Sequence, residues 1–163
     1  MREFEITRAR ESDAEALAAL EAVCFPPEEA ATLAGFEARL DAFGDWFFVA
    51  KDADGAIIGM IDGMATDEES IDDAMFEDAS LHREDGAVQT VFGLDVLPAW
   101  RGKGVAGALM RAFVDAAKQA GRRKVTLTCK AHLIGMYEHF GFTLIGKARS
   151  VHGGAEWFDM DMQ

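Results

Sequence analysis

The chain has 163 residues, which is enough for one domain with its own hydrophobic core and too few for two domains of ordinary size. Hydrophobic residues make up 50% of it and the formal net charge is −13, a balance that argues against DNA or RNA as a partner. No apolar run approaches the roughly 18 residues of a membrane span, and the N-terminus has no signal-peptide pattern. We therefore expect a single cytoplasmic domain over residues 1–163 that binds neither nucleic acid nor a membrane.

The two cysteines, Cys24 and Cys129, lie far apart in the sequence and in no spacing typical of metal ligands. In a chain without a secretion signal, such cysteines are expected to stay reduced. We therefore expect neither a disulfide bond nor a metal site.

The predicted elements mix strands and helices along the chain. Ser12 and Glu15 have the spacing of a capping box, which predicts a helix there, and Pro26–Pro27 predicts the end of that helix and the start of another. In chain order the predicted elements are a strand at 3–7, helices at about 13–24 and 27–40, strands at 46–50, 56–65 and 89–96, a helix at 104–120, a strand at 124–129, a helix at 133–140, and strands at 142–145 and 156–162. This order predicts an α/β (α+β) fold, in which a mixed central sheet of about six to seven strands is flanked by about four helices.

The segment between the strand at 89–96 and the helix at 104–120 has the features of a phosphate site. It reads Pro98-Ala99-Trp100-Arg101-Gly102-Lys103-Gly104-Val105-Ala106. The first N–H groups of a helix have no partner inside it and carry partial positive charge, glycines let the backbone approach a ligand, and Arg101 and Lys103 add two cations. A tight turn that binds nothing is the alternative, and a Walker loop is excluded because G-x-x-x-x-G-K-S/T does not occur.

Two motifs resemble landmarks of the GNAT acetyltransferase superfamily. The segment V-x-P-x-x-R-G-x-G-x-A, residues 96–106, resembles the acetyl-CoA signature Q/R-x-x-G-x-G/A of that family. About forty residues further on, Tyr137-Glu138-His139-Phe140-Gly141-Phe142 resembles its Y-x-x-x-G-F landmark, and the predicted elements follow the family order. The resemblance covers nearly the whole chain and implies a GNAT fold with acetyl-CoA as co-substrate.

A narrower resemblance is to the arylalkylamine (serotonin-type) N-acetyltransferases and their bacterial relatives. It rests on three short segments, Ser80-Leu81-His82-Arg83, Thr128-Cys129-Lys130 and Met136-Tyr137. This resemblance implies direct transfer of the acetyl group to a primary amine, for which an arylalkylamine or a polyamine is the expected small-molecule partner.

The resemblance also implies roles for individual residues. The N–H groups of the loop hold the cofactor pyrophosphate, the pantetheine arm pairs with the central strand, and Tyr137 protonates the departing thiolate. A core aromatic is the alternative interpretation of Tyr137, the only tyrosine of the chain. The cofactor-binding residues implied in this way are Leu94, Val96, Arg101, Gly102, Lys103, Gly104, Val105 and Ala106.

The general base is the residue that the resemblance does not supply. The arylalkylamine enzymes have two histidines on the central strand, where this chain has Thr90 and Phe92. Alternation along an unbroken strand places Asp95 on the opposite face from these two positions, which makes it a poor substitute. The other candidates are His82, His132, His139 and a chain of water molecules.

Phe25 and Phe92 are the candidate residues for an apolar acceptor pocket. Two alternatives to a small-amine acetyltransferase stay open at this point: an enzyme that acetylates a protein lysine or N-terminus, and a module that binds acyl-CoA without catalysis. GNAT proteins are often dimers, so the resemblance also leaves a homodimer open.

Overall fold

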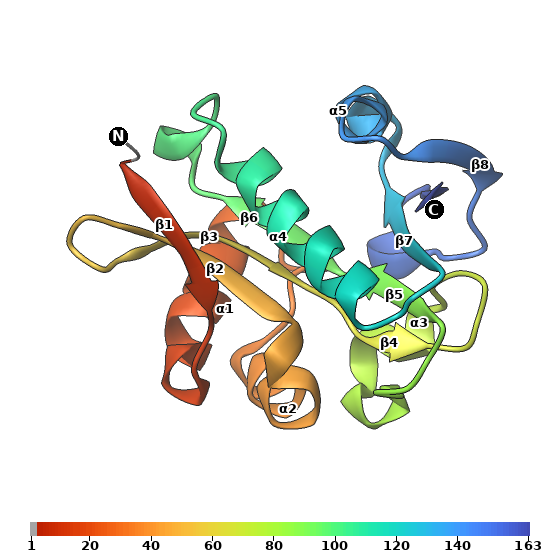
Figure 1. Cartoon of the computed structure of the whole chain (residues 1–163), viewed down its shortest axis with the longest axis horizontal. Coiled ribbons are helices and arrows are strands. Elements are labelled where there is room, and N and C mark those ends of the chain that lie inside the picture. Colours follow the sequence, from red (N-terminus) through yellow and green to blue (C-terminus); the bar gives the residue numbers. More distant parts are fainter. Residues whose placement is uncertain (1–2) are drawn as a thin grey trace.

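The computed structural model describes residues 3–163, and Figure 1 shows how their strands and helices are arranged. The helices are α1 (Ala14–Cys24), α2 (Leu33–Phe43), α3 (Asp73–Glu77), α4 (Val105–Gln119) and α5 (Ile134–His139). The strands are β1 (Phe4–Arg8), β2 (Phe47–Asp52), β3 (Ile57–Asp62), β4 (Ala65–Thr66), β5 (Val88–Val91), β6 (Gly93–Val96), β7 (Lys124–Cys129), β8 (Thr143–Lys147) and β9 (Phe158–Met162). The mixed α/β fold is confirmed, although the described strands number nine and form two sheets.

The two sheets meet where β5 is followed by β6. The first sheet has the order β1-β2-β3-β6 and is antiparallel throughout, whereas the second has the order β4-β5-β7-β9-β8 and contains one parallel pair, β5 with β7. The predicted single strand at 89–96 is therefore wrong, because the chain changes partners at Phe92. The N–H of Phe92 donates to the carbonyl oxygen of Asp62 at 2.7 Å, and Gly93 is paired with that same residue. Two residues thus face one, which is the geometry of a β-bulge.

Helix α4 packs on one face of the first sheet, and α1 and α2 lie on the other (Figure 1). The apolar residues of α4 recur at helical spacing, so that one face of the helix is buried and the other is polar. The residues on the buried face include Val105, Leu109, Phe113 and Ala117. Among residues 3–163, no helix is both long and apolar enough to cross a membrane.

The two N-terminal helix starts differ from their predicted positions. Asp13, and not Glu15, accepts a backbone hydrogen bond, from the N–H of Arg10 at 2.8 Å, because the chain first forms a short 3-10 turn. Helix α2 begins at Leu33 and is capped by the Thr32 hydroxyl, which accepts from the N–H of Gly35 at 3.1 Å. Pro26–Pro27 therefore ends α1 as predicted but begins a turn in place of a helix.

A close backbone approach beside the bulge gives a test of this sheet junction. A Cβ atom at Gly63 would lie 1.8 Å from the carbonyl oxygen of Thr90, so we expect Gly63→Ala to lower the free energy of unfolding by about 3 kcal/mol. Gly44→Ala is the matched control, since Gly44 has helical φ and ψ with no atom within 4 Å of its Cβ position. Chemical denaturation of both variants checks this, and equal stability of the two would contradict the backbone packing described here.

Candidate active site

A cleft of about 1490 Å³ opens where the two sheets diverge. Strand β6 pairs with β3 and with no other described strand, so its second edge is open, and the C-terminal end of β7 faces it across the gap. Helices α4 and α5 also line it, and α1, α2 and α3 contribute further walls. The strand residues that line the cleft are Val91, Gly93, Leu94 and Val96 on one side and Leu127, Thr128 and Cys129 on the other.

The open edge of β6 presents backbone groups to the cleft. The N–H of Leu97 donates to Ile58 of β3, whereas the carbonyl oxygen of Val96 accepts from Arg101 Nε at 3.2 Å on the side away from β3. Backbone polar groups point to alternate sides along a strand, so those of Leu94 also face away from β3. The edge at Leu94 and Val96 is therefore suited to pair with an extended, amide-containing chain such as the pantetheine arm.

The predicted phosphate loop lies at the cleft and has the backbone geometry that the sequence requires. Gly102 and Gly104 have φ values of 78° and 84°, in the left-handed region that favours glycine, and no atom lies within 4 Å of either Cβ position. Gly104 is the N-cap of α4 and offers no side-chain cap, which leaves the first N–H groups of the helix, at Val105 and Ala106, without an acceptor in the helix. Open helix-initial N–H groups beside Arg101 fit the pyrophosphate of acetyl-CoA.

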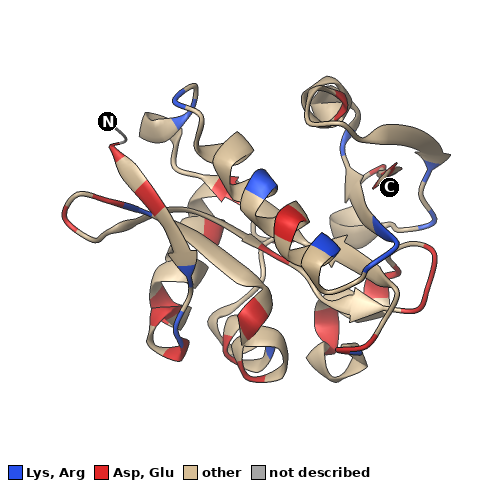
Figure 2. Ribbon diagram, viewed as in Figure 1, with Lys and Arg blue, Asp and Glu red and all other residues tan. Residues whose placement is uncertain are grey.

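Lys103 is the one predicted cofactor residue whose side chain does not line the cleft. Its Nζ lies 5.3 Å from the centroid of the Trp100 ring and 3.8 Å from a carboxylate oxygen of Glu3. Arg111, about two turns into α4, does line the cleft and supplies a second cation on this wall. Figure 2 shows basic residues in the loop before α4 and along that helix, while acidic residues predominate on α1, α2 and the segment around α3.

Tyr137 lies on α5 in the wall of the cleft and is 7% exposed. The rings of Phe140 and Phe142 contact it edge-on, at centroid distances of 6.3 and 5.9 Å. Burial raises the pKa of its phenol, and the nearby Cys129 and Asp95 raise the pKa further. The phenol therefore keeps its proton at neutral pH and is able to donate it. Burial likewise raises the pKa of Cys129 to about 11, so this cysteine is present as a thiol.

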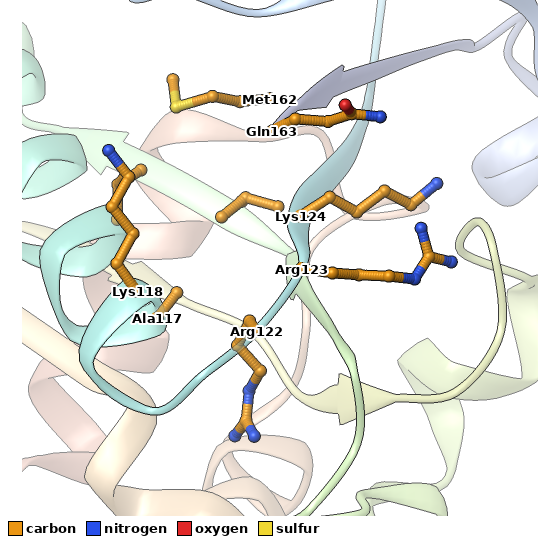
Figure 3. A pocket seen from close by; sticks show the side chains of 9 residues that line it. Ala117, Lys118, Arg122, Arg123, Lys124, Met162 and Gln163 are labelled. Carbon is orange, nitrogen blue, oxygen red and sulfur yellow. The ribbon is translucent and has the colours of Figure 1, made fainter.

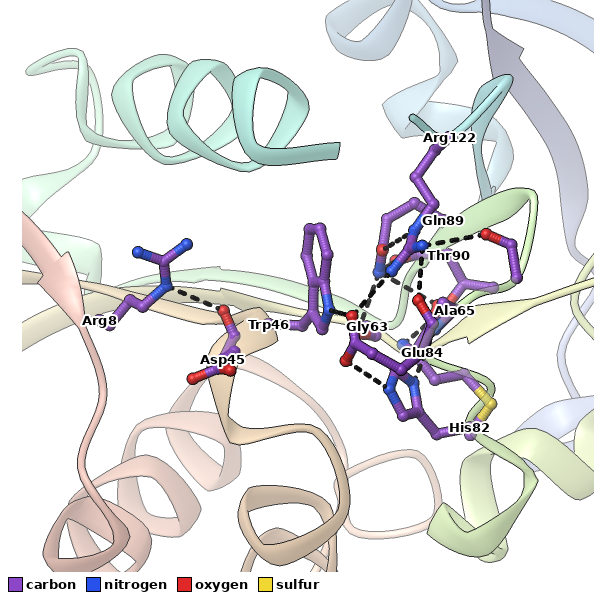
Figure 4. Close-up of polar contacts among 12 residues, drawn as sticks. Arg8, Asp45, Trp46, Gly63, Ala65, His82, Glu84, Gln89, Thr90 and Arg122 are labelled. Carbon is purple, nitrogen blue, oxygen red and sulfur yellow. Dashed lines mark hydrogen bonds and ion pairs between the residues drawn. The ribbon is translucent and has the colours of Figure 1, made fainter. Parts of the chain in front are cut away.

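The candidate base His82 and Thr90, at one of the two family histidine positions, lie outside the cleft, in the polar network of Figure 4. The Nδ1 of His82 accepts from the N–H of Ala65 at 3.0 Å, and its Nε2 lies 3.0 Å from a carboxylate oxygen of Glu84. Thr90 donates its hydroxyl to the carbonyl oxygen of Met64 at 2.9 Å. The predicted shared face of Thr90 and Phe92 is wrong, because the bulge at Phe92 interrupts the alternation and only Phe92 reaches the cleft. His132 and His139 line the cleft as exposed residues.

The end of the cleft beyond β6 is rich in aromatic side chains. The predicted residues Phe25 and Phe92 both line it, together with Phe76 and with two residues that sequence reasoning missed, His152 and Trp157. The ring of His152 stacks on that of Phe76 at 4.6 Å, and Phe76 lies 5.0 Å from Phe92. His152 and Trp157 belong to the segment between β8 and β9, whose sequence carries no motif that would have indicated the site. We call this region the acceptor end.

A second, much smaller hollow lies beside the C-terminal end of α4 and the start of β7 (Figure 3). Its volume of about 20 Å³ is enough for roughly one water molecule. Lys124 in its wall contacts Glu69 at 3.0 Å and Asp161 at 2.9 Å, and Arg123 also pairs with Glu69. These cations are already neutralised, so the hollow has no evident ligand chemistry. Among residues 3–163, no group of three or more His, Cys, Asp or Glu side chains is placed to hold a metal ion.

The family model described as acetyltransferase (GNAT) family matches residues 14–142. The chain belongs to this family. It is accordingly an acetyl-CoA-dependent N-acetyltransferase with acetyl-CoA as its co-substrate. No curated protein matches the chain in sequence.

Solved GNAT structures share the fold at low sequence identity. The loading GNATL domain of CurA from Lyngbya majuscula is 15% identical with a TM-score of 0.84, over 98% of this chain and 97% of that domain. The GphF GNAT-like decarboxylase in complex with isobutyryl-CoA is 24% identical with a TM-score of 0.79, over 97% and 98% of the two chains. Arabidopsis thaliana Naa50, in complex with the bisubstrate analogue CoA-Ac-MVNAL, is 17% identical with a TM-score of 0.76, over 99% of both.

Substitution in the loop tests the assigned pyrophosphate site. We expect Gly104→Val to weaken acetyl-CoA binding by about tenfold or more, because a β-branched residue at φ 84° costs about 1–3 kcal/mol and displaces the N–H groups. Gly55→Val is the matched control, since Gly55 has a similar φ of 82° and equally open surroundings but lies in the β2–β3 turn. Calorimetric titration with acetyl-CoA separates the two, and equal affinities would rule out the loop as the pyrophosphate site.

Proposed function

We propose that this N-acetyltransferase acts on a small primary amine, with an arylalkylamine as the favoured acceptor. The observation that carries the proposal is a bridge across the acceptor end, made by residues 150–157. The N–H of Val151 donates to a carboxylate oxygen of Asp73 at 3.2 Å, and Nε2 of His152 lies 2.9 Å from the carbonyl oxygen of Glu29. The bridge is compatible with a small molecule but obstructs a peptide chain that would continue out of this end.

The aromatic residues of the acceptor end favour a flat, apolar acceptor body. Phe76 and His152 present stacked rings, and Phe92 stands where the arylalkylamine enzymes have a histidine, which makes the wall more apolar. Aromatic side chains bind a second ring by offset or edge-on contact. A planar arylalkyl group matches this wall better than the hydrated chain of a polyamine does.

The charges at the acceptor end favour a cationic acceptor. The two cations there are already paired, Arg39 with Asp62 at 3.1 Å and Lys130 with Glu29 at 2.7 Å. The other carboxylates that line the end have no cation within 4 Å among the described residues; they are Glu21, Glu28 and Glu77. This surplus of negative charge supports an ammonium substrate and opposes a carboxylate-bearing acyl group of the kind a decarboxylase would take.

In the proposed reaction the acceptor nitrogen attacks the thioester carbonyl of acetyl-CoA directly, and the CoA thiolate departs. A simple thiol has a pKa near ~8.5, so protonation assists its departure. Tyr137 is the proposed donor, because it lies in the cleft wall and its raised pKa keeps the phenol protonated. Leu94 and Val96 orient the pantetheine arm, and the loop at 101–106 holds the pyrophosphate.

A panel of acceptors tests the proposed substrate class. We expect CoA release from acetyl-CoA, followed with a thiol reagent, to show a higher kcat/KM for tryptamine or phenethylamine than for spermidine, free lysine or a lysine peptide. Preference for the peptide would favour the protein-acetyltransferase alternative. Acetyl-CoA binding without CoA release to any amine would favour a non-catalytic module. Release of CO2 from malonyl-CoA would instead indicate a decarboxylase.

Replacing the proposed acid tests the mechanism separately. We expect Tyr137→Phe to lower kcat for the best amine by about 10²-fold, the usual range for loss of a general acid, while acetyl-CoA affinity is unchanged. The ring contacts with Phe140 and Phe142 persist in this variant, so its fold is preserved. Steady-state kinetics and titration with acetyl-CoA measure the two quantities, and an unchanged kcat would remove Tyr137 from the chemistry.

A further inference from the structure

Three buried carboxyl groups converge on Gly93, the residue that follows the bulge. A Cβ atom at Gly93 would lie 3.2 Å from Oδ1 of Asp95, 3.2 Å from Oε1 of Glu21 and 3.4 Å from Oδ1 of Asp62. Their exposed fractions are 1%, 5% and 0%, respectively. Any side chain at position 93 would contact these oxygens, so glycine is what allows the three groups to meet here.

The cluster contains one cation for three carboxyl groups. Nη1 of Arg39 lies 3.1 Å from Oδ2 of Asp62, and its Nη2 donates to the carbonyl oxygen of Phe76 at 3.2 Å. Asp62 Oδ1 and both oxygens of Asp95 accept no hydrogen bond from the described residues. Buried carboxylates without donors are costly, and adjacent carboxylates do not all ionise together.

A proton held within the cluster accounts for this arrangement. Burial raises the pKa of Asp95 well above its usual range, and the neighbouring Glu21 raises it further. Burial likewise raises the pKa of Asp62 to about 7, against the opposing effect of Arg39. Asp95 is therefore the member that binds a proton most readily, and its O–H is placed to donate to the Glu21 carboxylate beside it.

Glu21 is the member of the cluster that lines the cleft. It lies in the last turns of α1, and its Oε2 accepts from the N–H of Ala31 at 2.7 Å, which fixes the side chain toward Gly93. Cys24, Phe92 and Gly93 line the cleft with it. Tyr137 lines the same cleft, so Glu21 and the proposed acid face a common space.

We propose that Glu21 is the proton acceptor for the substrate amine, directly or through one water molecule, and that Asp95 and Asp62 support it by sharing protons behind it. This inference rests on the proposed function. A primary ammonium group with a pKa near ~10.4 is neutral in only roughly one molecule in a few thousand at pH 7, and a carboxylate with protonatable neighbours provides a place for the proton.

In the proposed reaction the ammonium nitrogen loses two protons. Glu21 takes one proton from the ammonium group, which gives a neutral amine and a carboxylic acid. The nitrogen lone pair then forms the C–N bond, the C–S bond breaks with its electron pair on sulfur, and Tyr137 protonates that thiolate. The second proton lost by nitrogen restores the Tyr137 phenol. The proton on Glu21 leaves to solvent, so the products are the amide, CoA and one proton.

Two amines of the same shape and different basicity test the role of Glu21. We expect Glu21→Gln to lower kcat for phenethylamine by about 10²-fold but kcat for β,β-difluorophenethylamine by less than about fivefold. Fluorine withdraws electrons, so much of the second amine is already neutral at the assay pH and needs no base. Glu15→Gln is the matched control, because Glu15 lies on the same helix but is exposed and does not line the cleft. It should leave both rates unchanged.

The outcomes separate this inference from the proposed function. If the unaltered protein turns over neither amine, the proposed function fails. If the unaltered protein turns over both amines, Glu21 is not the proton acceptor in either of two cases: Glu21→Gln lowers kcat for both amines equally, or it raises only KM. Glutamine removes one carboxylate from a cluster with an excess of them, so folding should persist, as thermal unfolding and acetyl-CoA titration will show. Glu21→Asp keeps the negative charge but places it farther from the cleft, because the side chain is one methylene shorter. This variant should lower kcat for phenethylamine by an intermediate factor and should not lower kcat for the fluorinated amine.

Discussion

The change of strand partner at Phe92 is the constraint on which the site depends. Up to Val91 the chain pairs with β7, and from Gly93 onward it pairs with β3, while the N–H of Phe92 is held by Asp62. The sheets must then separate, and the separation leaves one edge of β6 unpaired. An unpaired strand edge inside a protein would be costly, because buried backbone groups need partners. Pairing with the pantetheine arm would satisfy them, so the same break creates the cleft and specifies the kind of ligand that fills it.

The change of strand partner at Phe92 also brings three carboxyl groups close together. Because Gly93 lies opposite Asp62 and has no side chain, the carboxyl groups of Asp62, Asp95 and Glu21 approach one another from β3, β6 and α1. Burying these carboxyl groups lowers the stability of the fold, whereas apolar residues at the same positions would not lower it. Such costs are common where a protein uses the perturbed groups in chemistry. The acceptor end thereby combines an aromatic wall with an excess of negative charge.

The parts of the site that the sequence predicted are local ones. The segment from Pro98 to Ala106 carries its strand, its glycines, its cations and its helix start within a few residues, so the positive φ values of Gly102 and Gly104 follow from that pattern. Tyr137 was recognised by its spacing to Gly141 and Phe142. Lys103 shows the limit of such reasoning, because its side chain lies on Trp100 and Glu3 and not in the cleft. Strand alternation failed at Phe92 because a bulge leaves no signal in the order of apolar and polar residues.

The sequence by itself determined the order of strands and helices, the glycine loop at the start of α4 and the tyrosine on α5, because each follows from a pattern among near neighbours in the chain. Only the tertiary structure decided which carboxylates meet at Gly93, which aromatic residues of the β8–β9 segment close the acceptor end, and that His82 and Thr90 are engaged elsewhere. These groups come from segments that are far apart in the sequence. Their proximity, and the pKa values that follow from it, arise from burial and charge pairing that exist once the sheets and helices have packed.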